Sequence, residues 1–126
     1  MKEAKRLIVL VLLLFITTTC STKNEPPLQE TSWIKFVLTD ACDDGYSPDI
    51  TYYDMTDGVS TWGPYYLQVY GEPLYQTLDC NVGDKICVGA WMNDTFWGCG
   101  QECAEGCDNC CGFCNGQVLE YTLTCQ

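Results

Sequence analysis

Eleven cysteines in a chain of 126 residues are the side chains with the greatest capacity for chemistry. Six of them fall within residues 99–114, CGQECAEGCDNCCGFC. Sulfur at this density serves as a metal cage, a redox centre or a set of disulfide bridges. The compartment in which the protein works decides between these uses, because thiolates persist only in reducing surroundings.

The N-terminus indicates that the chain is exported. Lys2, Lys5 and Arg6 form a basic start, residues 7–16 are an uninterrupted apolar run, and small residues follow. This is the order of an export signal. Ten apolar residues are too few for a permanent membrane span, which needs about 20. We therefore expect residues 1–19 to be a signal peptide that is removed from the mature protein.

The apolar run leads through three threonines to Cys20 and the polar segment STKNEPPLQET, residues 21–31. In this arrangement the chain resembles bacterial lipoproteins, whose export signal ends in a short box closed by a cysteine. The resemblance implies that Cys20 becomes a lipidated N-terminus and that residues 20–31 tether the protein to a cell-envelope membrane. It covers only residues 1 to about 31. Without the lipid, the same signal would make the protein extracellular.

The cysteine count agrees with this interpretation, because an odd cysteine in an exported protein needs an explanation. Lipidation of Cys20 would supply one and leave ten cysteines for five bridges. Since the chain leaves the reducing compartment, we expect disulfides at Cys42, Cys80, Cys87, Cys99, Cys103, Cys107, Cys110, Cys111, Cys114 and Cys125.

A metal site is the first alternative use of these cysteines. The spacing of Cys103, Cys107 and Cys110 resembles that of ligands for zinc or an iron–sulfur cluster. The oxidising compartment and the lack of histidine argue against it, and six local cysteines are two too many for one tetrahedral site. We expect no metal and no other cofactor there.

A redox centre is the second alternative. Cys111 and Cys114 form a C-x-x-C unit, CGFC, similar to the active-site turn of thioredoxin-type oxidoreductases. That turn opens a helix inside a βαβ unit, and no such unit is predicted here. A secreted thiol–disulfide redox protein using Cys111 and Cys114 is therefore the rival hypothesis to structural bridges.

Two statements about pairing follow from the sequence. Cys80 and Cys87 flank the turn-like segment NVGDKI and are predicted to close a hairpin loop. The neighbours Cys110 and Cys111 are predicted to have different partners. The remaining connectivity stays open.

The elements that position the cysteines are predicted to be strands. Runs rich in aromatic and β-branched residues, bounded by Gly, Asp and Pro, lie at 33–39, 50–55, 65–70, 74–80, 85–92 and 117–125. In the last run Leu119, Tyr121 and Leu123 share one face. We predict an all-β fold, a small antiparallel β-sandwich over residues 32–126, in which residues 97–116 form a long disulfide-stapled loop.

Composition excludes some classes of partner. Without residues 1–19 the chain keeps three basic and sixteen acidic residues, a net charge of −13, and it has no arginine or histidine. Such a chain repels phosphate backbones, so nucleic acid is excluded as a partner. It also repels anionic membrane surfaces, which leaves a lipid as the means of membrane attachment.

Aromatic and acidic residues provide the candidate ligand sites. Trp62, Tyr65, Tyr66 and Trp97 would stack on sugar rings if exposed, although core packing is the preferred interpretation. The segment DACDDGYSPD supplies hard oxygen ligands for calcium, although a solvated acidic turn is preferred. Its four carboxylates belong to Asp40, Asp43, Asp44 and Asp49.

Catalysis is not expected. No histidine is available as a base near neutral pH, and no serine lies in a nucleophile elbow. Glycoside hydrolysis needs a pair of carboxylates, but among sixteen acidic residues some pair is inevitable, so its presence predicts nothing. The sequence thus predicts a lipid-anchored cell-surface module that binds an unidentified surface ligand or protein or has a structural role. A calcium- or carbohydrate-binding module is an alternative.

Overall fold

The computed structural model describes residues 26–58, 60–68, 70–107 and 109–125. The predicted signal peptide, Cys20 and residues 21–25 lie outside the described residues. Residues 26–30 are exposed and without regular structure. The first strand begins at Thr31, within one residue of the predicted start of the domain.

Strands dominate the described residues, which contain no α-helix. All six predicted strands are present, but the third lies earlier in the sequence than predicted, at 61–66 rather than 65–70. The elements are β1 (Thr31–Asp40), β2 (Asp49–Asp54), β3 (Thr61–Tyr66), β4 (Leu74–Asn81), β5 (Lys85–Met92), β6 (Thr95–Gly98), the 3-10 turn η2 (Gln101–Cys103), β7 (Cys111–Phe113) and β8 (Gln117–Leu123).

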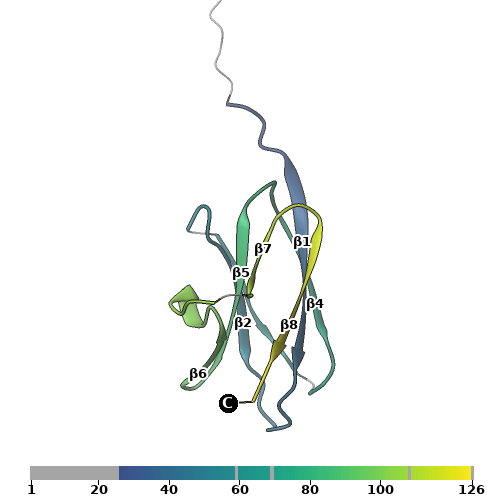
Figure 1. Ribbon diagram of the computed structural model, residues 1–126, viewed down its shortest axis with the longest axis vertical. Helices are drawn as coiled ribbons and strands as arrows, with labels where there is room; N and C mark the ends of the chain where they lie inside the picture. The colour runs from purple at the N-terminus through teal and green to yellow at the C-terminus, as the bar shows by residue number, and fades with distance from the viewer. Residues whose placement is uncertain (1–25, 59, 69, 108, 126) are drawn as a thin grey trace, which may run out of the picture.

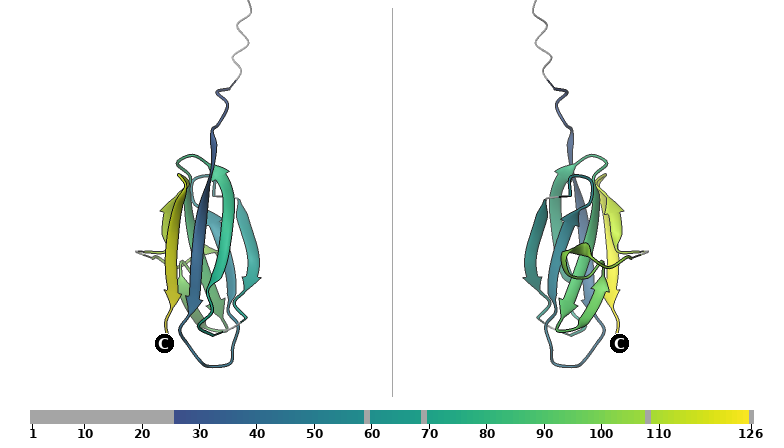
Figure 2. Two further views of the ribbon diagram at one scale, coloured as in Figure 1. Left: turned by 90° about the vertical axis from the view of Figure 1, so that its right-hand side faces the viewer. Right: turned by 90° about the vertical axis from the view of Figure 1, so that its left-hand side faces the viewer.

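Two packed sheets form a sandwich, as the sequence predicts (Figures 1 and 2). One sheet has the order β4-β1-β8 and the other the order β3-β2-β5-β6, with β7 also paired to β5. Every pair is antiparallel except β1 and β8, which run parallel from Ile34 opposite Gln117 to Asp40 opposite Leu123. The sequence-based expectation of antiparallel pairing therefore holds for every pair except this one.

The core lies between the inner faces of the two sheets. Ile34, Phe36 and Leu38 alternate along β1 and are fully buried, and the rings of Phe36 and Tyr52 meet across the sheets at 4.7 Å. The strand β5 differs from β1, because its residues 86–90 are buried without alternation. A strand with both faces buried must be covered on its outer face as well.

The predicted Cys80–Cys87 hairpin is wrong. Cys80 lies on β4 in the three-stranded sheet, whereas Cys87 lies on β5 in the other sheet, so the chain between them crosses from sheet to sheet. Cys80 is bonded to Cys114 and ties the two sheets together, and Cys87 is bonded to Cys111 on the adjacent strand β7. A turn-like composition cannot distinguish a hairpin from such a crossing.

Residues 97–116 are more regular than predicted. The end of β6 and the whole of β7 lie in this range, and both strands pair with the same edge of β5. Residues 89–92 of β5 pair with β6, and residues 85–87 pair with β7. The chain between β6 and β7 therefore leaves the edge of β5 and returns to it.

Tyr52 gives a test of the core. Its side chain is fully buried, and its hydroxyl has no hydrogen-bond partner among the described residues. Burial raises the pKa of the Tyr52 phenol, with a smaller contribution from Tyr65. Because a buried hydroxyl without a partner is destabilising, we expect Tyr52→Phe to raise the free energy of unfolding by about 1 kcal/mol in urea denaturation.

Tyr121→Phe is the matched control, because the Tyr121 hydroxyl accepts a hydrogen bond from the amide of Gly98 at 2.7 Å. The same chemical change should there lower the free energy of unfolding by about 1 kcal/mol. Changes of the same sign in both variants would contradict the assignment of Tyr52.

The disulfides give a second test. Double alanine variants should lower the free energy of unfolding by about 4 kcal/mol for Cys80–Cys114 and about 2 kcal/mol for Cys99–Cys103, because a bridge that closes a longer loop constrains the unfolded chain more. The two bridges span 34 and 4 residues. Equal losses in guanidinium denaturation would refute this order.

Candidate functional site

The stapled loop, which we define as residues 99–107 and 109–110, covers the outer face of the five-stranded sheet (Figure 2, right). The Cys99–Cys103 and Cys107–Cys110 bridges lie within it. The adjacent Cys87–Cys111 bridge ties the end of the loop to β5. This loop supplies the second cover that the sequence of β5 requires.

The loop backbone lies directly on β5 at Gly89. A Cβ atom at Gly89 would overlap the carbonyl oxygen of Gly100 and lie 3.1 Å from the ring of Tyr53. A Cβ atom at Gly98 would overlap the carbonyl oxygen of Val88, and Gly98 has a φ of 60°. Glycine is therefore required at both positions so that the loop can approach the strand.

Two tyrosine hydroxyls from the strands fix the loop and the residue that directly precedes it. The Tyr53 hydroxyl, from β2, accepts a hydrogen bond from the amide of Glu102 at 2.7 Å. The Tyr121 hydroxyl, from β8, accepts the Gly98 bond described above. Each sheet thus supplies one support, so the loop position depends on the packing of the whole sandwich.

The turn η2 holds two non-glycine residues in the left-handed region. Glu102 has a φ of 56° and Cys103 a φ of 53°. Such residues cost about 1 kcal/mol or more each and persist only where their surroundings over-determine them. The Tyr53 hydrogen bond and the Cys99–Cys103 bridge supply that constraint.

A pocket of about 290 Å³ opens between the stapled loop and β6. Its rim combines one aromatic ring with exposed carboxylates and an amide, a chemistry suited to a cationic or hydroxyl-rich group and unsuited to an anion. The lining residues are Phe96, Gln101, Glu102, Ala104 and Glu105.

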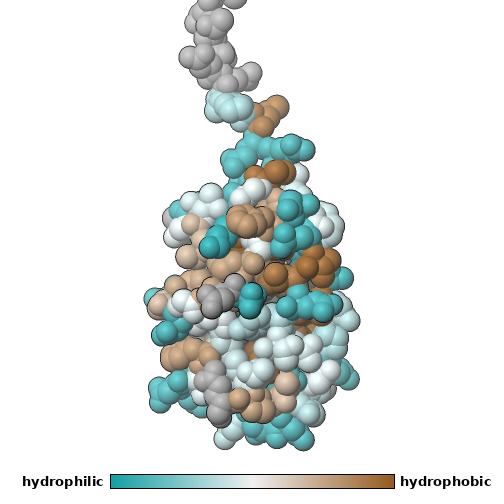
Figure 3. All heavy atoms as spheres, viewed as in Figure 1, coloured by the Kyte–Doolittle hydropathy of each residue, from teal (hydrophilic) through white to brown (hydrophobic). Residues whose placement is uncertain are grey.

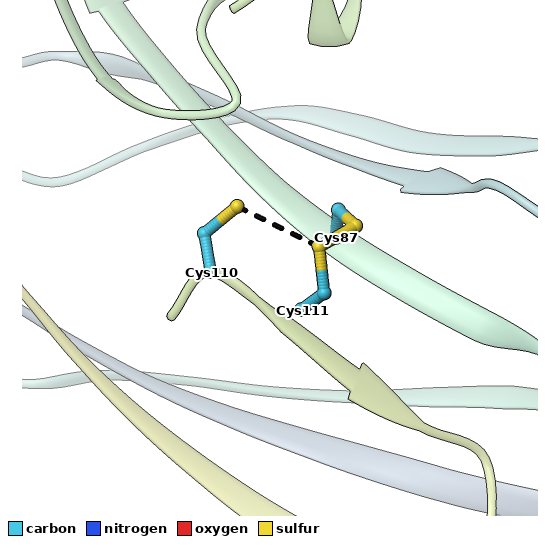
Figure 4. A group of neighbouring side chains, drawn as sticks. All are labelled: Cys87, Cys110 and Cys111. Atoms are coloured by element: carbon cyan, nitrogen blue, oxygen red, sulfur yellow. Dashed lines mark hydrogen bonds between the residues drawn. A yellow bond between two sulfur atoms is a disulfide. The ribbon is translucent and has the colours of Figure 1, made fainter. Parts of the chain in front are cut away.

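Two disulfides touch each other at the C-terminal end of the loop. The Sγ atom of Cys111 lies 3.7 Å from that of Cys110 and 3.8 Å from that of Cys107. The sulfurs of Cys87, Cys110 and Cys111 all lie within 4.8 Å of one another (Figure 4). All four sulfurs are in disulfides, whereas the thiolate is the form that binds a metal.

The predicted redox pair is not a pair in the structure. Cys111 is bonded to Cys87 and Cys114 to Cys80, so the CGFC unit contains the ends of two different bridges. The bonded C-x-x-C unit is instead Cys107–Cys110. Residues 107–110 and 111–114 are both C-x-x-C units, so the spacing in the sequence could not show which of the two is bonded. The prediction of different partners for Cys110 and Cys111 is confirmed.

The four predicted aromatic residues do not form one surface. Trp62 and Tyr65 pack against the core from the edge strand β3, because a bulge opposite Thr51 turns both towards the same face. Tyr66 is exposed. Trp97 lies on β6 at the opposite edge of the sheet, is buried, and donates from Nε1 to the carbonyl oxygen of Thr124.

The acidic segment 40–49 folds on its own carboxylates. Asp40 is buried, and its Oδ1 accepts the amide of Cys42 at 2.8 Å, while Asp44 accepts the amide of Tyr46 at 3.0 Å. Asp43 is exposed, and Asp49 begins β2. These hydrogen bonds shape a turn. Calcium binding at this segment stays a prediction.

Asp43 and Asp44 also line a second pocket, of about 210 Å³, at the end of the sandwich where the C-terminus lies. Trp97, Met92 and Thr95 line it as well, together with the bonded pair Cys42 and Cys125. Sequence reasoning named Trp97 and these acids separately, and only the fold brings them together.

A buried carboxylate that sequence reasoning missed lies at the other end of the sandwich. Burial raises the pKa of Asp54, whereas hydrogen bonds from the amides of Thr56 and Asp57 lower it. The carboxylates of Asp84 and Asp57 raise the pKa further. Asp54 caps the turn that follows β2, as Asp84 caps the turn before β5 by accepting the amide of Asn81.

Comparison with known protein families, with curated proteins and with solved structures gave no match to this chain. Within the described residues, no helix is long and apolar enough to cross a membrane.

The close approach at Gly89 predicts the behaviour of two glycine variants. Gly89→Ala should displace the stapled loop, lower the free energy of unfolding by about 2 kcal/mol and expose the Glu102 amide to hydrogen exchange. Gly106→Ala, within the same loop but with no atom near its added Cβ, should leave that exchange unchanged. Equal protection of the Glu102 amide in both variants would show that the loop does not depend on this contact.

Proposed function

We propose that this protein is exported, is anchored to a cell-envelope membrane through lipid on Cys20, and serves there as a binding or structural module. The observation that carries the proposal is the pairing of its cysteines. The ten cysteines from Cys42 to Cys125 form five disulfides, which indicate an oxidising environment outside the cytoplasm. This leaves Cys20, outside the described residues, to account for the odd count.

The positions of the two chain ends, at opposite ends of the sandwich, support anchoring through the N-terminus. Residues 26–30 enter the sandwich at one end, and the C-terminus lies at the other (Figure 1). The pocket between Asp44 and Trp97 lies at the far end, beside the Cys42–Cys125 bridge. In a protein held by its N-terminus, this pocket would face away from the membrane.

Apolar side chains are also distributed unevenly between the two ends of the sandwich. Apolar side chains gather in the half nearer residues 26–30 on the face shown in Figure 3. Trp33 and Val118 are exposed apolar residues of β1 and β8, and Phe113 is one of β7. The far end is more polar on that face. A module anchored by its N-terminus would hold its apolar half towards the envelope.

Rigidity supports the binding role. The stapled loop is held by two internal bridges and by the Tyr53 hydroxyl, and the Tyr121 hydroxyl holds Gly98 directly before it. A loop ordered in advance loses little conformational entropy when a ligand binds. With a net charge of −13, the mature chain would select cationic or neutral ligands over anionic ones.

Intact mass of the natively purified protein tests the proposal. We expect an N-terminal Cys20 carrying acyl chains, and a gain of ten hydrogens on full reduction. Cys20→Ser should lose the acyl mass and leave the membrane fraction while keeping the gain of ten hydrogens. Cleavage at another site without acylation would overturn the anchor, and a smaller gain on reduction would overturn the five bridges.

A further inference from the structure

Four sulfur atoms form a continuous cluster on the outer face of β5. The Cys107–Cys110 bridge contacts Cys111 through both of its sulfurs, at 3.8 and 3.7 Å. The sulfur of Cys110 also lies within 4.8 Å of that of Cys87. The two bridges are therefore close enough for a thiolate released from one to reach the other.

The four cysteines of the cluster differ in their exposure to solvent. Cys110 is fully buried and Cys87 almost so, whereas Cys107 and Cys111 are half-buried. The bridge of Cys107 to Cys110 lies entirely within the stapled loop. A Cβ atom at the neighbouring Gly106 would have no atom within 4 Å. A thiolate arriving from solvent can therefore attack the Cys107–Cys110 bridge at the sulfur of Cys107.

We propose that this cluster is a thiol–disulfide exchange site that takes an external thiolate at Cys107 and interconverts two disulfide pairings. The first pairing is the one in the structure, Cys87–Cys111 with Cys107–Cys110. The second is Cys87–Cys110 with Cys107–Cys111. The substrate is a small thiol or an exposed cysteine of another exported protein, cationic or neutral because Glu102 and Glu105 stand on the same loop.

The interconversion balances without an oxidant or a reductant. The external thiolate bonds to Cys107, the Cys107–Cys110 bond breaks, and its electron pair leaves on Cys110. The Cys110 thiolate bonds to Cys87, the Cys87–Cys111 bond breaks, and the electron pair passes to Cys111. The Cys111 thiolate then bonds to Cys107 and releases the external thiolate unchanged.

The rest of the fold tolerates this exchange. Cys80–Cys114 joins the two sheets, and Cys42–Cys125 joins the segments that follow β1 and β8. Neither of these disulfides takes part in the exchange. The exchange moves the covalent attachment of β5 by one residue, from Cys111 on β7 to Cys110 at the end of the loop. It thereby alters the stapled loop while the sandwich remains closed.

The Cys99–Cys103 bridge is an internal comparison. It too lies in the stapled loop, and Cys103 is half-buried like Cys107. Within the described residues, no third sulfur contacts this bridge. An external thiolate can open it, but the released thiolate has no second disulfide to attack.

Disulfide mapping of the natively purified full chain tests the proposal. The protein is incubated with cysteamine at mildly alkaline pH, quenched in acid, alkylated with N-ethylmaleimide and digested without reduction. We expect a cysteamine adduct on Cys107 and new peptides containing Cys87–Cys110 and Cys107–Cys111, whereas Cys99 and Cys103 should form no new pairing with other cysteines. Unchanged pairing, or adducts that form first on another bridge, would overturn the proposal.

Two single variants sharpen the test without any added thiol. Cys110→Ser leaves a thiol on Cys107, 3.8 Å from Cys111, and we expect the free thiol to be shared between Cys107 and Cys87. Cys103→Ser leaves a thiol on Cys99, and all other bridges should keep their partners. A free thiol confined to Cys107 in the first variant, or equal scrambling in both, would refute exchange through this cluster.

Discussion

The contact between the stapled loop and β5 is the constraint on which the rest of the molecule depends. The central strand is buried on both faces, and a sandwich of this size provides cover for only one of them. The loop supplies the other, and it can do so only because Gly89 lets its backbone touch the strand. Strained residues, two tyrosine hydroxyls and three disulfides all serve to hold that contact.

The disulfides divide into two groups with different consequences. Cys80–Cys114 and Cys42–Cys125 connect distant parts of the chain and stabilise the fold by restricting the unfolded state. The other three are gathered around the stapled loop, and two of those lie in mutual contact. The high density of cysteines, which first suggests a metal centre, here forms a framework of disulfides in one part of the molecule and two disulfides in contact, the proposed exchange site, in another.

Much of the fold follows from local patterns. The alternation along β8 predicted that strand, because burial of one face leaves a period of two in the sequence. The run of apolar and β-branched residues between turn signals predicted β5. The positions of β6 and β7 were missed, since short strands rich in glycine and cysteine have no such period. The direction of β8 relative to β1 was missed as well, because it depends on the number of strand reversals between them.

The sequence by itself determined the all-β class, the expectation of five bridges and the separate partners of Cys110 and Cys111, since composition and spacing constrain each of these locally. Tertiary structure decided which cysteines meet. Cys80 and Cys87 are neighbours along the chain yet lie in different sheets, whereas Cys42 and Cys125 meet across 83 residues. It also separated Trp97 from Trp62 and joined it to Asp44 in one pocket. Proximity in a sandwich depends on how strands are assigned to the two sheets, and that assignment is a property of the whole chain.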